Sequence, residues 1–255
     1  MKKNTQNKKI WIVGGSQGIG LELVKIWLAQ GHKVVASARN AESSVELAEL
    51  KRAYTNLSCL NLDVTDPQDC QVKSHQAWSL YDGLDMWFYN VGAYQPMTIK
   101  EWDWQSFNFM NQTNYLGAVS LMLALQPLFA EQGTGRWVWN TSLASYFGLP
   151  YGGGYSAPKA ALVNLAESLQ PELAQNGLQL QIINHGFVKT RLTEKNTFDM
   201  PGLVEPTQAA ILINQGLERS SGFEIRFPFG LRVMLSLLKV LPYRWSLAFT
   251  KKMLH

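Results

Sequence analysis

Cysteine, histidine and long apolar runs are all scarce in this chain of 255 residues. Only Cys59 and Cys70 are present, and neither belongs to a C-x-x-C motif. Two thiols in a chain of this length are typical of a reducing compartment, so we expect a cytoplasmic protein. The four histidines are scattered without the spacing of metal ligands, and we expect no structural metal.

The sequence also lacks the segments that direct a chain into or across a membrane. No stretch of 18 apolar residues occurs, so we expect no membrane-spanning helix. The opening MKKNTQNKKIWIVGG is basic, but only four apolar residues precede its glycines, too few for the core of a signal peptide. No repeat, low-complexity run or Gly/Ser-rich linker divides the chain, and 46% of it is hydrophobic. We therefore expect one compact domain.

The net charge of +4 is small, but the basic residues are unevenly placed. Lys2, Lys3, Lys8 and Lys9 crowd one end of the chain, and a second basic group follows Glu224. A basic tail can bind nucleic acid, but the sequence has no zinc-finger, RNA-binding or helix-turn-helix signature. We therefore expect no nucleic-acid partner.

Short β-rich runs alternate with helical stretches along the chain. Strands are predicted at 10–14, 33–38, 57–63, 84–90, 135–142, 178–184 and 223–227. Helices are predicted at 18–30, 42–53, 101–131, 155–174 and 206–219. Strands separated by helices need crossover connections, so the pattern predicts an α/β protein with a doubly wound, Rossmann-like, mostly parallel seven-stranded sheet. Ligands of such sheets bind at the carboxyl ends of the strands.

A glycine-rich turn, GGSQGIG (14–20), stands between the first predicted strand and helix. Glycine tolerates the tight turn and lets a pyrophosphate approach the backbone closely. The helix that follows offers free N–H groups and a positive dipole end to the phosphates. The turn therefore predicts a dinucleotide site at Gly14, Gly18 and Gly20.

A tyrosine and a lysine four residues apart, Tyr155 and Lys159, lie in YGGGYSAPKAAL (151–162). Residues at this spacing share one face of a helix. A fixed cation favours the phenolate, so we expect Lys159 to lower the pKa of Tyr155 from its ordinary value near 10. The pair predicts a phenol that can act as acid or base near neutral pH.

The glycine turn resembles the T-G-x-x-x-G-x-G turn of the short-chain dehydrogenase/reductase family, with Val13 in place of the threonine. The resemblance runs from about residue 9 to residue 227. Further marks follow in the family's order: LDVTD (62–66), YNVG (89–92), NYLG (114–117), Ser142 thirteen residues before Tyr155, and HGFVKT (185–190), where His185 replaces a proline.

The resemblance implies a catalytic tetrad of Asn114, Ser142, Tyr155 and Lys159 in an NAD(P)-dependent enzyme that interconverts a carbonyl and an alcohol. Tyr155 would be the general acid or base, Ser142 would hold the substrate oxygen, Lys159 would also bind the nicotinamide ribose, and Asn114 would anchor a water. The implied cofactor contacts are Gly14, Ser16, Gln17, Gly18, Ile19, Gly20, Arg39, Asp63, Val64, Asn90, Gly92, Tyr155, Lys159, Gly186, Val188 and Thr190. A catalytically silent NADP-binding scaffold is the alternative, because Val13 and His185 depart from the pattern.

The end of the second strand, VVASARN, favours NADP over NAD. Ala38 occupies the place of the acid that binds a ribose 2′-OH, and Arg39 follows it. A guanidinium fork suits a 2′-phosphate. The basic residue that many NADP-binding relatives carry in the glycine turn is replaced by Gln17.

The family comparison leaves the substrate open. The loop 187–206 is apolar and is predicted to be a mobile lid over a hydrophobic substrate. The family commonly forms dimers or tetramers, and the apolar face at Leu116, Val119 and Leu123 favours a homo-oligomer here.

The catalytic domain is expected at 1–227, and 228–255 is expected to be a helical extension in two parts, broken near Pro242. Two interpretations of this basic, apolar extension stay open. It could pack on the protein's own core or on a partner subunit. It could instead lie peripherally on an anionic membrane, with its apolar side chains inserted.

Overall fold

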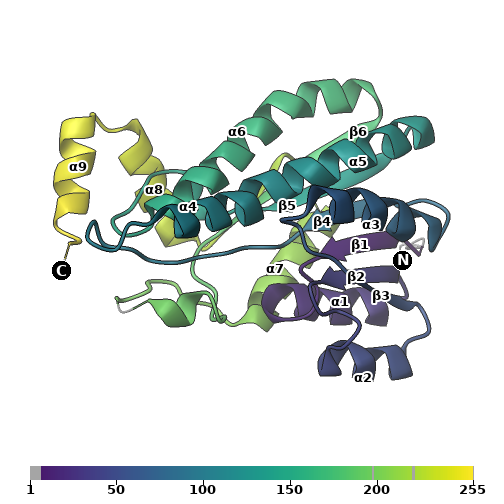
Figure 1. The fold of residues 1–255 in the computed structure, drawn as a ribbon. Coiled ribbons are helices and arrows are strands. Elements are labelled where there is room, and N and C mark those ends of the chain that lie inside the picture. The colour runs from purple at the N-terminus through teal and green to yellow at the C-terminus, as the bar shows by residue number, and fades with distance from the viewer. Residues whose placement is uncertain (1–6, 197, 220–221, 255) are drawn as a thin grey trace.

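The computed structural model describes residues 7–196, 198–219 and 222–254 (Figure 1). Lys2 and Lys3 of the basic N-terminal group lie outside the described residues, and so does Thr197 in the predicted lid.

A single parallel sheet organises the chain, as the sequence predicts. Its strands are β1 (Lys9–Val13), β2 (Lys33–Ala38), β3 (Leu57–Asn61), β4 (Met86–Tyr89), β5 (Gly135–Asn140), β6 (Leu178–His185) and β7 (Glu224–Phe227). They form a seven-stranded sheet in the order β3-β2-β1-β4-β5-β6-β7, and every pairing is parallel. The strand order reverses between β1 and β4, which is where a doubly wound sheet opens a ligand crevice.

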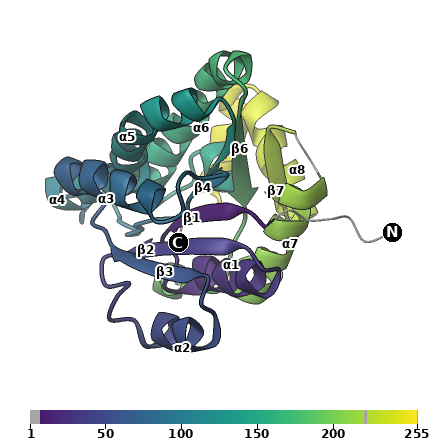
Figure 2. The same ribbon diagram turned by 90° about the vertical axis from the view of Figure 1, so that its right-hand side faces the viewer.

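Helices cover both faces of this sheet. One layer consists of α1 (Gly18–Ala29), α2 (Val45–Ala53) and α7 (Pro206–Arg219), and α1 packs against α7. The other consists of α3 (Pro67–Ser79), α4 (Trp104–Asn111), α5 (Gly117–Gln132) and α6 (Gly153–Gln175). Figure 2 shows the two layers on opposite sides of the sheet. The fold is therefore the predicted doubly wound, Rossmann-like one.

Neighbouring residues of the central strands enter different cores because successive side chains point to opposite faces of a sheet. Trp87 and Trp137 pack under the α3, α5 and α6 layer, with their ring centroids 5.5 Å apart. Phe88 and Val138 pack under the α1 and α7 layer. All four side chains are buried. Strands buried on both faces read as continuous apolar runs, which is why these segments were visible in the sequence.

The sequence analysis missed one helix, α3. Asp66 caps its N-terminus by accepting hydrogen bonds from the backbone N–H groups of Gln68 and Asp69, and Pro67 occupies the first helical position. These are ordinary start signals. The buried side of α3 consists of small side chains, Cys70, Ser74 and Ala77, so it gives no apolar stripe.

The helical region predicted at 101–131 contains an irregularity. A π-helical turn, η1 (Gln112–Leu116), separates α4 from α5. Such turns shift the side chains that follow them and are frequent at functional sites. Asn114 lies within it.

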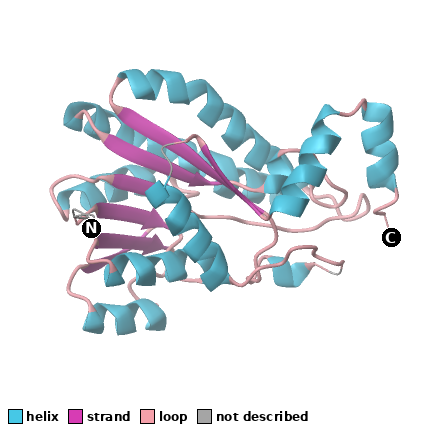
Figure 3. Ribbon diagram, turned by 180° about the vertical axis from the view of Figure 1, so that it is seen from behind, coloured by secondary structure: helices cyan, strands magenta, loops and turns pink. Residues whose placement is uncertain are grey.

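The chain ends in two further helices, α8 (Phe229–Val240) and α9 (Tyr243–Lys251), with the predicted break at Pro242. They stand at the end of the molecule opposite the N-terminus, as Figures 1 and 3 both show. None of the described helices combines the length and the apolar composition needed to cross a bilayer.

Candidate active site

A cavity of ≈ 920 Å³ lies at the carboxyl ends of the strands, beside the reversal of strand order. Its volume is within the range of ligand pockets. All the predicted site residues line it except Gly20 and Asn114. Those two lie behind its wall, where each supports residues that do line it.

The glycine turn needs glycine at its key positions. Gly14 and Gly18 have φ angles of 92° and 56°, in the region that favours glycine. A Cβ added to Gly20 would lie 1.9 Å from the carbonyl oxygen of Gly14. No side-chain rotation can relieve this overlap, because the backbone fixes the positions of both atoms. Gly20 therefore lets α1 start directly against the turn.

The N-terminus of α1 is ready to bind an anion. Among the described residues, no side chain caps the helix at Gln17, and its first turn, Gly18–Leu21, is uncharged. The first N–H groups of a helix lack intrahelical partners and carry the positive end of its dipole. A phosphate of a dinucleotide fits this arrangement.

A chain of hydrogen bonds joins this turn to Lys159. The ammonium Nζ of Lys159 donates to the carbonyl oxygen of Asn140, 2.8 Å away. The Asn140 amide Nδ2 donates to Asn90 Oδ1 over 2.7 Å, and Asn90 Nδ2 donates to the carbonyl oxygen of Gly14 over 2.9 Å. The sequence analysis identified Asn90 but missed Asn140, which no motif marked.

Tyr155 and Ser142 meet in the cavity. Tyr155 lies in the first turn of α6, and the Ser142 hydroxyl lies close enough to its phenol to act on the pKa of Tyr155. Ser142 follows β5 and accepts a 3.1 Å hydrogen bond from the backbone N–H of Ala144, which fixes its side chain. The glycine directly before Tyr155 has a packing reason, since a Cβ on Gly154 would lie 2.4 Å from Cε of Met110. Glycine lets α6 begin close against α4.

Lys159 is buried on the same side of α6, and its Nζ lies 5.9 Å from the centre of the Tyr155 ring. Burial lowers the pKa of Lys159 to about 7. Burial also raises the pKa of Tyr155, and the neighbouring Ser142 hydroxyl only partly opposes this rise. The expected lowering of the Tyr155 pKa by Lys159 is therefore wrong for the protein without ligand. Both groups have lost water, and the charged form of each is destabilised.

Asn114 is buried, and its side chain is committed to the backbone of one residue. Its Oδ1 accepts from the N–H of Ala93 over 3.0 Å, and its Nδ2 donates to the Ala93 carbonyl over 2.8 Å. The residue thus fixes the loop at Gly92 and Ala93, which lines the cavity. Its position within η1 is what brings it there.

His185, which departs from the family pattern, also lines the cavity. Burial lowers its pKa to about 4, so the imidazole is neutral near neutral pH. Its Nδ1 lies 2.7 Å from the carbonyl oxygen of Gly186. As a hydrogen bond this contact requires the proton on Nδ1, which leaves Nε2 as an acceptor.

Tyr94 was missed by the sequence analysis. Its ring lies edge-on to that of Tyr155, with centroids 5.3 Å apart, and its hydroxyl donates to Asn196 Oδ1 over 2.8 Å. Leu231 and Leu235 of α8 also line the cavity and were missed. No sequence motif marks these three residues. They reach the cavity because segments far apart in the chain fold together there.

The predicted adenine-side residues lie at the other end of the cavity. Arg39, directly after β2, is exposed and lines the rim together with Ala38. The Asp63 carboxylate accepts hydrogen bonds from the backbone N–H and the hydroxyl of Thr65 at 2.9 and 2.8 Å. It is therefore held in one orientation beside Val64.

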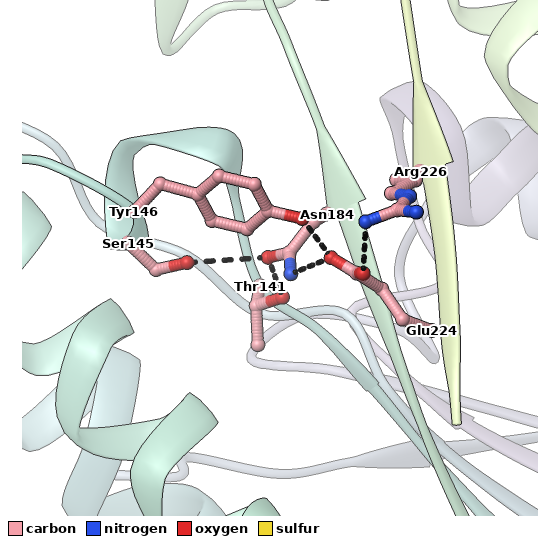
Figure 4. A network of polar contacts seen from close by, with 6 residues as sticks. All are labelled: Thr141, Ser145, Tyr146, Asn184, Glu224 and Arg226. Carbon is pink, nitrogen blue, oxygen red and sulfur yellow. Dashed lines mark hydrogen bonds and ion pairs between the residues drawn. The ribbon is translucent and has the colours of Figure 1, made fainter. Parts of the chain in front are cut away.

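A polar network lies beside Ser142 and ties together the ends of β5, β6 and β7 (Figure 4). Thr141 donates its hydroxyl to Asn184 Oδ1 over 2.5 Å, and Asn184 Nδ2 donates to Glu224 Oε1 over 2.7 Å. Tyr146 donates to the same carboxylate, and Arg226 lies 3.1 Å from its other oxygen. Because Thr141 and Tyr146 flank Ser142 in the chain, the network fixes the segment that carries the serine.

Comparison with known proteins decides the family. A model of the short chain dehydrogenase family matches residues 8–200. The chain belongs to the short-chain dehydrogenase family. This short-chain dehydrogenase is 33% identical to an uncharacterized oxidoreductase of Myxococcus xanthus over 91% of both chains.

Solved structures agree in fold. A short-chain dehydrogenase from Streptomyces avermitilis superposes with a TM-score of 0.80 at 24% identity, covering 97% of this chain and 98% of its own. A Burkholderia cenocepacia relative, solved in complex with NADP, gives 0.81 at 18% identity, covering 96% and 97%. The family model and the Myxococcus xanthus relative identify this short-chain dehydrogenase as an oxidoreductase.

The buried ammonium gives a prediction about stability. Lys159→Met should raise the midpoint of thermal unfolding more at about pH 6 than at about pH 9. The pKa of Lys159 is about 7 in the folded protein, against an ordinary value of 10.5. Between these pH values the unfolded chain binds a proton at Lys159 that the folded chain does not, so the free energy of unfolding of the wild type rises with pH. Methionine does not titrate, so the variant lacks this dependence.

Differential scanning calorimetry at both pH values measures the effect, with the exposed Lys51→Met as the control. The account is contradicted if Lys159→Met shifts the midpoint equally at the two pH values.

Proposed function

We propose that the protein is an NADP(H)-dependent oxidoreductase of the cytoplasm that interconverts a ketone or aldehyde and an alcohol, with Tyr155 as general acid or base. The observation that carries this proposal is the meeting of Tyr155, Ser142 and Lys159 in a cavity that continues to the glycine turn. The two free thiols, Cys59 and Cys70, are in keeping with a reducing compartment.

A nicotinamide dinucleotide fits the residues present. The glycine at position 20 lets α1 begin directly against the turn, because a Cβ there would overlap the Gly14 carbonyl oxygen, and the N-terminus of α1 supplies N–H donors for phosphates. Asn140 and Thr113 line the cavity. The buried Asn140 Oδ1 and Thr113 Oγ1 have no hydrogen-bond partner among the described residues. When bound, the nicotinamide supplies or accepts the hydride.

The protein's own groups handle the proton and the substrate oxygen. Ser142 holds that oxygen with its hydroxyl, and Tyr155 donates the phenolic proton to it as the alcohol forms, or removes it in the reverse direction. Burial keeps the Tyr155 phenol protonated, as the reductive direction requires. Lys159, whose pKa of about 7 lies near neutrality, exchanges protons readily and stabilises a phenolate once one forms.

The NADP preference rests on Arg39. The side chain is exposed on the cavity rim, next to Ala38 where an acid would repel a 2′-phosphate. The Burkholderia cenocepacia relative, which shares the fold, binds NADP.

The proposed substrate is a hydrophobic carbonyl compound. Met110, Leu149, Phe187, Leu231 and Leu235 line the cavity and present apolar side chains to it. Phe187 and Phe198 of the predicted lid contact each other edge to face, with centroids 6.0 Å apart. We propose that this segment covers the substrate.

Tyr155→Phe removes the phenolic proton and should lower turnover by a factor of at least about 10² while leaving NADPH binding nearly unchanged. The assay is NADPH consumption across a panel of ketones and aldehydes, with Tyr243→Phe, an exposed phenol, as the control. Unchanged turnover in Tyr155→Phe on a genuine substrate eliminates the mechanism. Wild-type protein that binds NADPH and reduces nothing supports the silent scaffold instead.

Arg39→Asp should weaken NADPH binding by at least about 10-fold more than it weakens NADH binding, because it sets a like charge against the 2′-phosphate. Fluorescence titration of both cofactors measures this, and Arg52→Asp, exposed on α2 and away from the cavity, is the matched control. Equal losses for the two cofactors mean that Arg39 does not bind the phosphate.

We also propose a homo-oligomer that associates through α5. Leu116, the last residue of η1, and Val119 of α5 are half-buried, but Leu123 of α5 is 66% exposed. Light scattering of the wild type should give a dimer or tetramer, and Leu123→Glu should shift it toward the monomer because a charge would be buried at the contact. A wild-type monomer at micromolar concentration refutes this proposal.

A further inference from the structure

The last two helices form a hairpin, residues 229–251, that carries an exposed apolar stripe. Phe229, Val233, Leu237 and Val240 of α8 are 71%, 37%, 54% and 77% exposed. Their spacings of four, four and three residues place them on one side of the helix. The stripe therefore runs the length of α8 on its solvent side.

The opposite side of α8 is already packed. Leu235 and Leu238 are buried against Leu143, and Leu231 packs beside them. The fold itself therefore uses one apolar side of α8 and leaves the other uncovered by any described residue. Packing on the protein's own core does not explain the exposed stripe.

The second helix, α9, also carries exposed apolar side chains. Its buried residues are Ser246 and Thr250, and the Ser246 hydroxyl donates to the carbonyl oxygen of Leu238 over 2.8 Å. This bond holds α9 against the end of α8. Tyr243, Trp245, Leu247 and Phe249 are between 45% and 77% exposed. Aromatic side chains of this kind are favoured at the interface between water and lipid.

The charge on the hairpin has one sign. It carries Arg232, Lys239, Arg244 and Lys251, and Lys252 follows directly. The last acidic residue of the sequence is Glu224, which is paired with Arg226 at 3.1 Å.

Two of these cations lie over exposed rings of the same surface. The guanidinium carbon of Arg232 is 4.8 Å from the ring centre of Phe229, and that of Arg244 is 5.2 Å from the ring centre of Trp245. The cations thus border the apolar side chains instead of pointing away from them.

We propose that the hairpin is a docking surface for an anionic membrane. Its apolar side chains would insert at the level of the acyl boundary, and its cations would meet the headgroups. A second copy of the chain fits this surface less well. A twofold interface brings the same patch of both subunits together, so Arg232 and Arg244 beside the exposed rings would face the same cations of the partner, and the hairpin has no acid to pair them.

Docking would also orient the active site. Leu231 and Leu235 of α8 line the cavity, while the stripe on the same helix faces outward. Figures 1 and 3 show α8 and α9 at the end of the molecule where the strands point their carboxyl ends. A docked hairpin therefore sets one wall of the cavity beside the lipid, the phase that concentrates hydrophobic carbonyl compounds. This consequence rests on the proposed function, whereas the docking does not.

Sedimentation with vesicles tests the docking without any catalysis. The full-length protein is mixed with phosphatidylcholine vesicles with or without phosphatidylglycerol, at about 0.05 M and about 0.5 M salt, which brackets strong and weak screening. Leu237→Glu/Val240→Glu places acids on the stripe, and Arg244→Glu/Lys251→Glu reverses two cations. Val45→Glu, a 68% exposed valine on α2, is the matched control.

The wild type and Val45→Glu should bind the phosphatidylglycerol vesicles at low salt and be released at high salt. Each hairpin variant should lower the partition coefficient by at least about 10-fold, since a basic residue near the surface adds about 1 kcal/mol. The proposal is overturned if the wild type stays in the supernatant at low salt, or if both hairpin variants bind as well as the wild type. The surface belongs to a second copy instead if the wild type binds no vesicles, is a dimer by light scattering, and becomes a monomer in Leu237→Glu/Val240→Glu.

A wild-type protein that binds no vesicles but reduces carbonyl compounds would overturn the docking alone. Vesicle binding without any reduction would overturn the proposed function alone.

Discussion

The burial of one ammonium group, that of Lys159, is the constraint on which the site depends. Burying a charge costs free energy unless the charged group is hydrogen-bonded. The Lys159 ammonium donates a hydrogen bond to the carbonyl oxygen of Asn140 at the end of β5. Through Asn140 and Asn90 that bond extends to the carbonyl of Gly14 in the glycine turn. The glycine turn and the segment that carries Lys159 are thereby linked across the ends of three adjacent strands, β1, β4 and β5.

Burial shifts the pKa values of Lys159 and Tyr155 in opposite directions. The pKa of Lys159 falls to about 7, whereas the pKa of Tyr155 rises. A phenol that stays protonated is what the proposed delivery of a proton to the substrate oxygen requires. The neighbouring network of Thr141, Asn184 and Glu224 supplies rigidity, because it fixes the backbone around Ser142.

Much of this was predictable from the sequence because short motifs and strand periodicity encode local structure. The seven strands and the glycine turn were found in this way. The helix α3 was missed since its buried side is Cys70, Ser74 and Ala77, which gives no apolar pattern. Residues such as Tyr94, Asn140 and Leu231 could not be found, because the contacts that bring them to the cavity join segments far apart in the chain. The pKa of Tyr155 was mispredicted because burial cannot be read from the spacing of two residues.

The central claim is that the cavity binds one nicotinamide dinucleotide with its phosphates on the glycine turn. Isothermal titration calorimetry of NADPH into the wild type, Gly20→Ala and Gly153→Ala tests it most directly. A Cβ at Gly20 would lie 1.9 Å from the Gly14 carbonyl oxygen, whereas one at Gly153 would meet nothing within 4 Å. The account predicts one NADPH per chain for the wild type and for Gly153→Ala, and binding weakened by at least about 100-fold, or about 2.7 kcal/mol, in a folded Gly20→Ala. Wild-type protein that binds no NADPH, or Gly20→Ala that binds it as tightly as the wild type, would contradict the account.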